Sequence, residues 1–171
     1  ASLTLEVFGL SDIGLVRKGN EDVMVVRDDL GLYAVFDGAG GHDAGDIAAA
    51  AAARSVQKHI AETEAEAREK PDLDPFGIAV DGRRLATAVH RANRAVSDIA
   101  RAAKSKRGMG TTVVALLFSK RSSLVHVVHA GDSRCYRLRA GNLEQLTVDH
   151  SMINDVIEQR PDLDDDVLSS L

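Results

Sequence analysis

The chain has 171 residues, of which 44% are hydrophobic and 27% charged, a composition typical of a globular domain and not of a disordered chain. Its formal net charge of −5 gives no indication of a nucleic-acid or anionic-membrane partner. No uncharged run approaches the roughly 20 residues of a membrane span, and the N-terminus lacks the features of a signal peptide. The single cysteine, Cys135, excludes an internal disulfide and predicts a reducing, cytoplasmic location.

The first 61 residues predict three strands followed by a helix. Alternating or β-branched apolar runs place the strands at residues 3–8, 23–26 and 33–36. Residues 28–31 between the last two strands predict a hairpin turn. Residues 37–42 are too rich in glycine for helix or strand, and Asp43 can then cap an alanine-rich helix that ends near Ala61.

The remaining residues predict a second helix, four strands and a third helix. Apolar residues spaced alternately by three and four predict the second helix over residues 85–103, with one buried face. Lys104, Lys106 and Arg107 follow it, where cations complement the helix dipole, and this favours a solvated helix end over a docking surface. Strands in an antiparallel meander are expected at residues 111–118, 124–130, 135–139 and 143–147, before a helix over 152–159 capped by Ser151.

Carboxylates stand at the ends of several predicted strands. Glu21 and Asp22 precede one strand, Asp37 follows the next, and Asp132 follows a later one. Hard divalent cations prefer several oxygen ligands, which carboxylates and exposed backbone carbonyls can supply. For Asp37 and Asp132 the spacing alone favours turn aspartates that bond their own backbone, but both interpretations stay open. Cys135 is expected to be a small packed strand residue and not a nucleophile.

Conspicuous sequence blocks occur in a fixed order along most of the chain. They are residues 11–14 with Arg17 and 20–22, residues 35–42 with 45–46, residues 109–112, residues 131–134 and residues 146–151. Together these blocks resemble the PP2C-type metal-dependent protein serine/threonine phosphatases in their bacterial form. The resemblance extends from about residue 3 to residue 157.

This resemblance implies a fold and a metal centre. The fold would be of the α+β class, an antiparallel β-sandwich flanked by helices in an αββα arrangement. Asp37 would bridge two Mn²⁺ or Mg²⁺ ions, and the Gly38 carbonyl would join the second ion. Glu21 would serve that second ion directly or through water, and Asp22 would orient waters from behind. Asp132 matches the aspartate that binds a third, weaker metal in bacterial relatives.

The resemblance also implies a reaction and its partners. Arg17 would hold the substrate phosphate, which suits the planar, bidentate donors of a guanidinium, and would act with Asp37 in catalysis. A water activated between the ions would attack phosphorus in line, without a phosphoenzyme. The partners would be proteins carrying phosphoserine or phosphothreonine, placed there by a bacterial serine/threonine kinase. Ala39 stands where many eukaryotic relatives have histidine, a proposed general acid, and where bacterial members commonly have methionine.

The family domain continues beyond the helix at Met152 into a flap, a strand ending in Ser-Asp-Gly and a last metal aspartate. We therefore expect residues 1–171 to form a single phosphatase domain that stops at the flap, without the C-terminal strands and without two of the three carboxylates of the first metal.

Three hypotheses follow: a phosphatase whose C-terminal part lies outside the chain, a catalytically silent relative that binds phosphoproteins or regulates a partner, and a different metal hydrolase such as a sporulation-type phosphatase. Arg17 and residues 20–22 weigh against the third.

Overall fold

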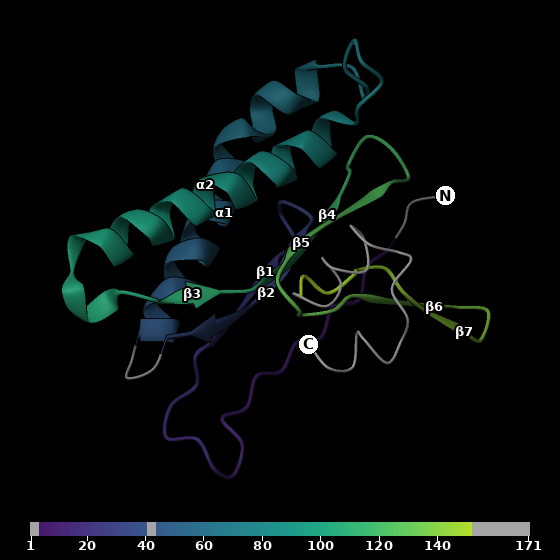
Figure 1. Ribbon diagram of the computed structural model, residues 1–171. Coiled ribbons are helices and arrows are strands. Elements are labelled where there is room, and N and C mark those ends of the chain that lie inside the picture. Colours follow the sequence, from purple (N-terminus) through teal and green to yellow (C-terminus); the bar gives the residue numbers. More distant parts are fainter. Residues whose placement is uncertain (1–3, 41–43, 152–171) are drawn as a thin grey trace, which may run out of the picture.

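A computed structural model of the protein describes residues 4–40 and 44–151. The expected helix over residues 152–159 and the Asp43 cap lie outside them. Two long helices lie side by side across one face of an antiparallel sheet, and a small hairpin projects away from the helices (Figure 1). Antiparallel sheets with flanking helices confirm the expected α+β class. In the described part of the chain, neither long helix has an apolar stretch that could cross a membrane.

The main sheet has the strand order β1-β2-β4-β5 and is antiparallel throughout. Its strands are β1 (Asp22–Arg27), β2 (Leu32–Ala39), β4 (Val113–Phe118) and β5 (Val125–Ala130), and the short β3 (Gly110–Thr111) pairs with the end of β2. The hairpin turn between β1 and β2 is confirmed, with Leu30 N–H donating to the Arg27 carbonyl at 3.0 Å. The expectation that no strand enters the glycine-rich stretch is wrong, because β2 continues through Gly38 to Ala39, where it pairs with β3.

The second sheet is a separate hairpin of β6 (Tyr136–Arg139) and β7 (Asn142–Gln145). The expected continuous meander is therefore wrong at one point, because β5 and β6 do not pair among the described residues. The chain leaves the main sheet at Gly131, whose φ of 104° is strained for any residue with a side chain. A Cβ there would also lie 2.8 Å from a Thr112 methyl carbon, so the turn brings the end of β5 close to the start of β4.

The helices are α1 (Ala44–Glu69), α2 (Val80–Ala102) and the short 3-10 helix η1 (Lys104–Lys106). The sequence correctly predicted α2 but ended the first helix about two turns too early. Its charged extension is stabilised by i,i+4 ion pairs, of which Arg68–Glu64 spans 3.1 Å and Lys58–Glu62 spans 3.7 Å. Alternating charges thus continue a helix whose apolar stripe has ended.

The hydrophobic core lies between the helices and one face of the sheet. Along β2, Leu32, Ala34 and Phe36 are buried and face the helices, whereas the residues between them face the other way. The small side chains of α1, such as the fully buried Ala48 and Ala49, let the helix lie close to the sheet. This alternation puts Asp37 on the sheet face that the helices do not cover.

The expected strand at residues 3–8 is wrong. Residues 4–10 have no regular secondary structure, and Phe8 and Leu10 are largely exposed. A strand needs a hydrogen-bonded neighbour, and no described segment pairs with these residues. Alternation in the sequence indicates that a segment can form a strand, but it does not show whether a partner strand is available.

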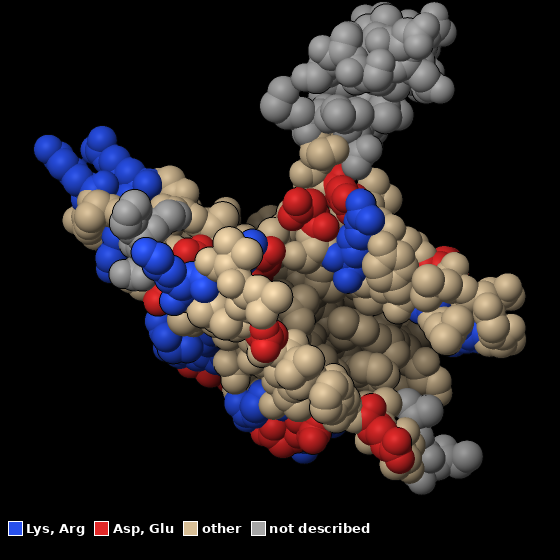
Figure 2. Space-filling view, turned by 90° about the horizontal axis from the view of Figure 1, so that it is seen from below, with Lys and Arg blue, Asp and Glu red and all other residues tan. Residues whose placement is uncertain are grey.

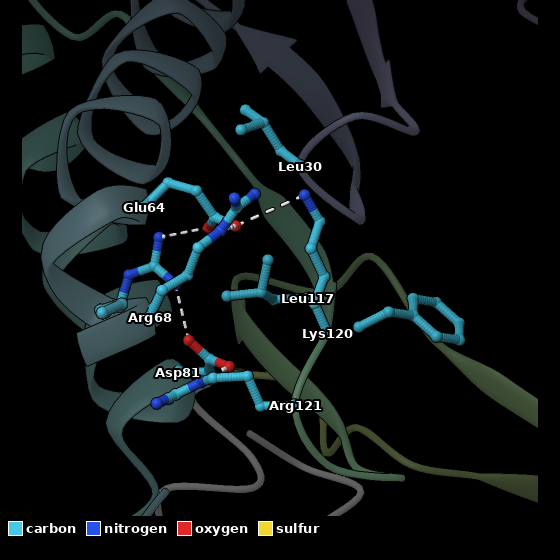
Figure 3. Close-up of a pocket in the computed structure, with 10 residues that line it drawn as sticks. Leu30, Glu64, Arg68, Asp81, Leu117, Lys120 and Arg121 are labelled. Atoms are coloured by element: carbon cyan, nitrogen blue, oxygen red, sulfur yellow. Dashed lines mark hydrogen bonds and ion pairs between the residues drawn. The ribbon is translucent and has the colours of Figure 1, made fainter. Parts of the chain in front are cut away.

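A network of buried ion pairs joins both helices to the loop after β4 (Figure 3). Arg84 donates to Asp81 Oδ1 at 2.6 Å, to Glu64 Oε2 at 3.0 Å and to the Ile60 carbonyl at 2.9 Å. The Arg84 side chain is only 10% exposed, and Lys120 lies 3.4 Å from Glu64. This network fixes the end of the helix pair that is far from Asp37, since Glu64 lies about 30 Å along α1 from the start of the helix.

Candidate active site

Acidic residues gather at one end of the main sheet. Because the strands are antiparallel, the start of β1, the end of β2, the start of β4 and the end of β5 meet there. Asp22 and Asp37 are direct partners in the register of β1 and β2 and lie on the same face. The Cβ atoms of such pairs are about 5 Å apart, and like charges in this arrangement repel each other. A bound cation would therefore relieve the repulsion between ionised Asp22 and Asp37.

The electrostatics of Asp37 agree with that geometry. Burial raises the pKa of Asp37, and the neighbouring carboxylates of Asp22 and Asp132 raise it further. Arg17 is the cation that opposes this rise. The structure therefore brings together four of the predicted residues, Arg17, Asp22, Asp37 and Asp132, with more negative than positive charge.

Two hydroxyl groups, which the sequence analysis did not single out, connect Asp37 to the turn that contains Asp132. The Asp37 N–H donates to Thr112 Oγ1 at 3.2 Å, and Thr112 Oγ1 shares a 2.6 Å hydrogen bond with Ser133 Oγ. The Thr112 N–H donates in turn to the Asp37 carbonyl at 2.9 Å. Thr111 adds a third contact, its hydroxyl donating to the same carbonyl at 3.0 Å. The threonines of the 109–112 block were the available signal for this role.

Glu21 and Gly38 lie beside this group, against the start of α1. The Gly38 N–H donates to the Glu21 carbonyl at 3.2 Å. A Cβ on Gly45 would lie 2.0 Å from Glu21 Oε2, and one on Gly38 would lie 2.3 Å from the Gly45 carbonyl oxygen. Only glycines allow this contact, and it puts the Glu21 carboxylate at the helix N-terminus, where the dipole favours negative charge. Glu21 thus faces α1 instead of joining the Asp22–Asp37 pair.

A hollow of about 560 Å³ adjoins the site on the Glu21 side. Arg17, Lys18, Glu21, Gly38 and Asp46 are among the residues that line it. Cationic side chains, which suit a phosphate, and carboxylates, which suit a metal ion, therefore line the same hollow. Asp46 is exposed in the first turn of α1, and the sequence analysis gave it no role.

The loop that carries Arg17 is closed at its base by side chains. Asn20 Nδ2 donates to Ser11 Oγ at 2.7 Å, and Asn20 Oδ1 accepts from the Asp22 N–H at 3.0 Å. Asn20 therefore links the loop to the first residue of β1. Arg17 itself is exposed and free to contact a ligand in the hollow.

The donor set fits a hard divalent cation in kind, because it consists of carboxylates with excess negative charge. It does not enclose an ion by itself. Among residues 4–40 and 44–151, no three Asp, Glu, His or Cys side chains are grouped closely enough to hold a metal. The carboxylates of Asp22, Asp37 and Asp132 therefore form an open, partial set of ligands.

Cys135 does not compete for a catalytic role. Its side chain is buried beside β6, and burial raises the pKa of the thiol, which disfavours the thiolate. The prediction of a packed, unreactive cysteine agrees with this position.

Comparison with known proteins adds independent information. The sequence profile described as "Protein phosphatase 2C" matches residues 19–159. The serine/threonine protein phosphatase PstP of Mycobacterium tuberculosis is 33% identical over 158 residues, which are 92% of this chain and 27% of PstP. Serine/threonine phosphatase Stp of Listeria welshimeri is 33% identical over 150 residues, which are 86% of this chain and 55% of Stp.

Solved structures agree in fold. The crystal structure of PstP from Mycobacterium tuberculosis gives a TM-score of 0.71 at 30% identity and covers 95% of this chain and 61% of that one. A structure of the PstP catalytic domain in complex with two manganese ions gives a TM-score of 0.69 at 30% identity, covering 92% and 61%. The chain thus spans only part of the length of these relatives. Sequence profile, relatives and fold agree that the chain belongs to the protein phosphatase 2C family.

Proposed function

We propose that this chain contributes the phosphate-binding arginine and part of the metal centre of a metal-dependent protein serine/threonine phosphatase, within a single domain to which residues 1–171 belong. The observation that supports it best is the Asp22–Asp37 pair, two carboxylates directly opposite each other, near both Asp132 and Arg17. Relatives named as serine/threonine phosphatases and the manganese complex of PstP support the same assignment.

Two Mn²⁺ or Mg²⁺ ions would be held by Asp37 and the Gly38 carbonyl, with Glu21 serving one of them directly or through water and Asp22 orienting waters from behind. Asp132 would serve a third, weaker ion. When bound, such ions neutralise phosphate charge and lower the pKa of water to near neutrality. The pKa of Asp37 is raised and Asp37 has to lose its proton to act as a ligand, so metal affinity is expected to fall as the pH is lowered.

The chain's own side chains bind and orient the substrate. The Arg17 guanidinium offers two parallel N–H donors to the phosphate of a phosphoserine or phosphothreonine. Asn20 holds the base of its loop, and Thr112 with Ser133 holds Asp132 close to Asp37. Ala39 carries no titratable group, so the proton for the leaving alcohol comes from a donor other than the side chain at this position.

A second function is favoured by the open ligand set. Because no three metal-ligating side chains of the described residues are grouped around one ion, the chain could bind phosphoproteins through Arg17 without hydrolysing them. This alternative also makes the phosphate group the ligand, but it needs no activated water.

Mn²⁺-dependent hydrolysis of p-nitrophenyl phosphate by the 171-residue chain, and by the gene product that contains it, tests the proposal. We expect turnover that requires Mn²⁺, vanishes in Asp37→Asn and falls by at least about a hundredfold in Arg17→Ala. Asp98→Asn, which changes an exposed aspartate of α2 outside the group of site residues, is the matched control. Phosphopeptide binding that depends on Arg17, with no turnover in either protein, would overturn the phosphatase assignment in favour of the binding module.

A further inference from the structure

The cations that follow α2 are not part of its C-terminal turn. α2 ends at Ala102, and Ala103 is fully extended at φ −135° and ψ 126°. Lys104, Lys106 and Arg107 then occupy a separate turn, residues 104–107, called here the basic turn. These cations therefore lie just beyond the last turn of α2, where the helix dipole acts, and Lys104 and Arg107 are exposed, in agreement with the expected solvated helix end.

The basic turn has a defined conformation. The Lys106 N–H donates to the Ala103 carbonyl at 3.0 Å, and the Arg107 N–H donates to the Lys104 carbonyl at 3.3 Å. Met109, which follows the turn, donates to the Lys106 carbonyl at 3.3 Å and is only 7% exposed. The core thus fixes one end of the turn, so its cations are held in one place.

The basic turn lies next to the candidate active site. A Cβ on Gly40 would lie 2.9 Å from Met109 Cα, so the chain after the turn touches the chain after Asp37. Thr111 pairs with Gly38, and the four residues from Arg107 to Thr111 can span at most about 14 Å. Because an extended peptide advances about 3.3 Å per residue, the turn lies within reach of positions about three to six residues from a phosphorylated residue bound at Asp37.

Within the part of the chain that the structure describes, the cations of the turn have no acidic partner. No carboxylate of the described residues lies within ion-pair distance of Lys104, Lys106 or Arg107, and nearby Arg101 has only a long 3.9 Å contact with Asp98. Figure 2 shows blue side chains gathered at the left-hand end of the molecule, where α2, η1 and β3 lie in Figure 1. In a chain with a net charge of −5, this local excess of positive charge is distinct.

We propose that the basic turn is a docking surface for acidic residues that lie about three to six positions from the phosphorylated residue of a protein substrate. This inference rests on the proposed function and narrows its substrate class. The surface fits an acidic peptide better than a nucleic acid, because residues 100–112 contain no aromatic side chain for stacking and the chain as a whole is negative.

The test compares phosphothreonine peptides that differ only in charge. Three aspartates are placed about three to six residues before or after the phosphothreonine, and the reference peptides have asparagine at the same positions. The variant is Lys104→Gln, Lys106→Gln and Arg107→Gln combined. The matched control combines Lys58→Gln, Lys70→Gln and Arg139→Gln, which removes the same number of exposed cations elsewhere. Hydrolysis of p-nitrophenyl phosphate, too small to reach the turn, reports catalysis alone.

We expect the unaltered chain to prefer one acidic peptide over its asparagine partner by about fivefold in kcat/KM at about 0.05 M salt, with the preference shrinking at about 0.5 M salt. The basic-turn variant should lose this preference and keep its activity toward p-nitrophenyl phosphate, and the control should keep both. Equal preference in the chain and the basic-turn variant would overturn the inference. An oligonucleotide of the same charge that displaces the acidic peptide would also overturn it.

The two proposals fail separately. If p-nitrophenyl phosphate is not hydrolysed at all, the phosphatase assignment fails, and fluorescence anisotropy with the same labelled peptides still tests the docking surface. We then expect the acidic peptides to bind the chain about fivefold more tightly than they bind the basic-turn variant. Equal affinities would end the docking proposal as well.

Discussion

At the scale of single residues, Thr112 shows how neutral groups organise an acidic site. Its hydroxyl accepts from the Asp37 N–H and bonds Ser133, and its own N–H donates to the Asp37 carbonyl. Two segments of the candidate site that are far apart in the sequence are thereby joined at one side chain. Outer groups of this kind orient metal ligands and are commonly worth tenfold or more in metal affinity.

Thr112→Val removes the hydroxyl but keeps the shape and the β-branched backbone preference. We expect Mn²⁺ affinity, measured by isothermal titration calorimetry, to fall by roughly tenfold, because Asp132 and Asp37 lose their link. Thr112→Ser should restore the affinity, and Thr87→Val on α2 should leave it unchanged. Unaltered Mn²⁺ affinity in Thr112→Val would show that the hydroxyl bridge does not position the site.

At the scale of elements, local pattern predicted what local interactions determine. α2 has one apolar stripe and was predicted over nearly its whole length, and β1 and β2 were found with their turn. The segment at residues 3–8 was wrong because its strand depends on a partner that its own sequence does not specify. The break between β5 and β6 was missed because Gly131 and Thr112, which are distant in sequence, determine it together.

The candidate site, like the fold, has features that the sequence predicts and features that it does not. Its acidic residues were predicted from the resemblance, and their positions at strand ends agreed with it. The direct pairing of Asp22 with Asp37 depends on strand register, and the turning of Glu21 toward α1 depends on contact with Gly45. Neither can be deduced from spacing, because both arise where separate elements meet.

The ion-pair network around Arg84 is an element-scale device, since it joins α1, α2 and the loop after β4. Arg84→Ala leaves Asp81 and Glu64, which are 7% and 16% exposed, without their main partner. We expect urea unfolding to show a loss of about 3–5 kcal/mol, with a smaller loss in Arg84→Lys. Arg137→Ala, which breaks an exposed pair with Glu144, should cost at most about 1 kcal/mol.

The same network predicts a pH dependence. Burial is the largest influence on Glu64 and Asp81 and opposes their ionisation, but the bonds from Arg84 and neighbouring cations leave the pKa of each below its usual value. Their contribution is therefore present above the ordinary carboxylate pKa of about 4 and is lost as pH falls through the lowered values. Arg84→Ala should accordingly be less sensitive to acid than the unaltered chain. Equal acid sensitivity would assign the acid response to other groups.

At the scale of the whole molecule, paired and unpaired charges lie at opposite ends of the helix pair. The end near Glu64 contains ion pairs that are satisfied internally, whereas the end near Asp37 has carboxylates that repel each other and cations with no acidic partner among the described residues. Charges left unbalanced in this way cost stability and are typical of sites that bind ligands. The molecule is thus expected to gain stability when that end is occupied.

Asp37→Asn tests whether the unbalanced charge lowers stability without metal and raises it when metal is bound. Because the pKa of Asp37 is raised in the fold, the folded chain holds more protons than the unfolded chain between the two pKa values, so stability falls as pH rises through that window. Without metal at about pH 7, the variant should therefore unfold at a slightly higher temperature than the unaltered chain, and the difference should vanish below about pH 4.

Mn²⁺ at about a hundred times its Kd should reverse the order, adding about 2.7 kcal/mol to the unaltered chain alone. Thermal unfolding followed by circular dichroism in chelator and in Mn²⁺ measures both, with Asp98→Asn as the control. A metal-free variant less stable than the unaltered chain would mean that the Asp22–Asp37 repulsion is already relieved by the protein itself.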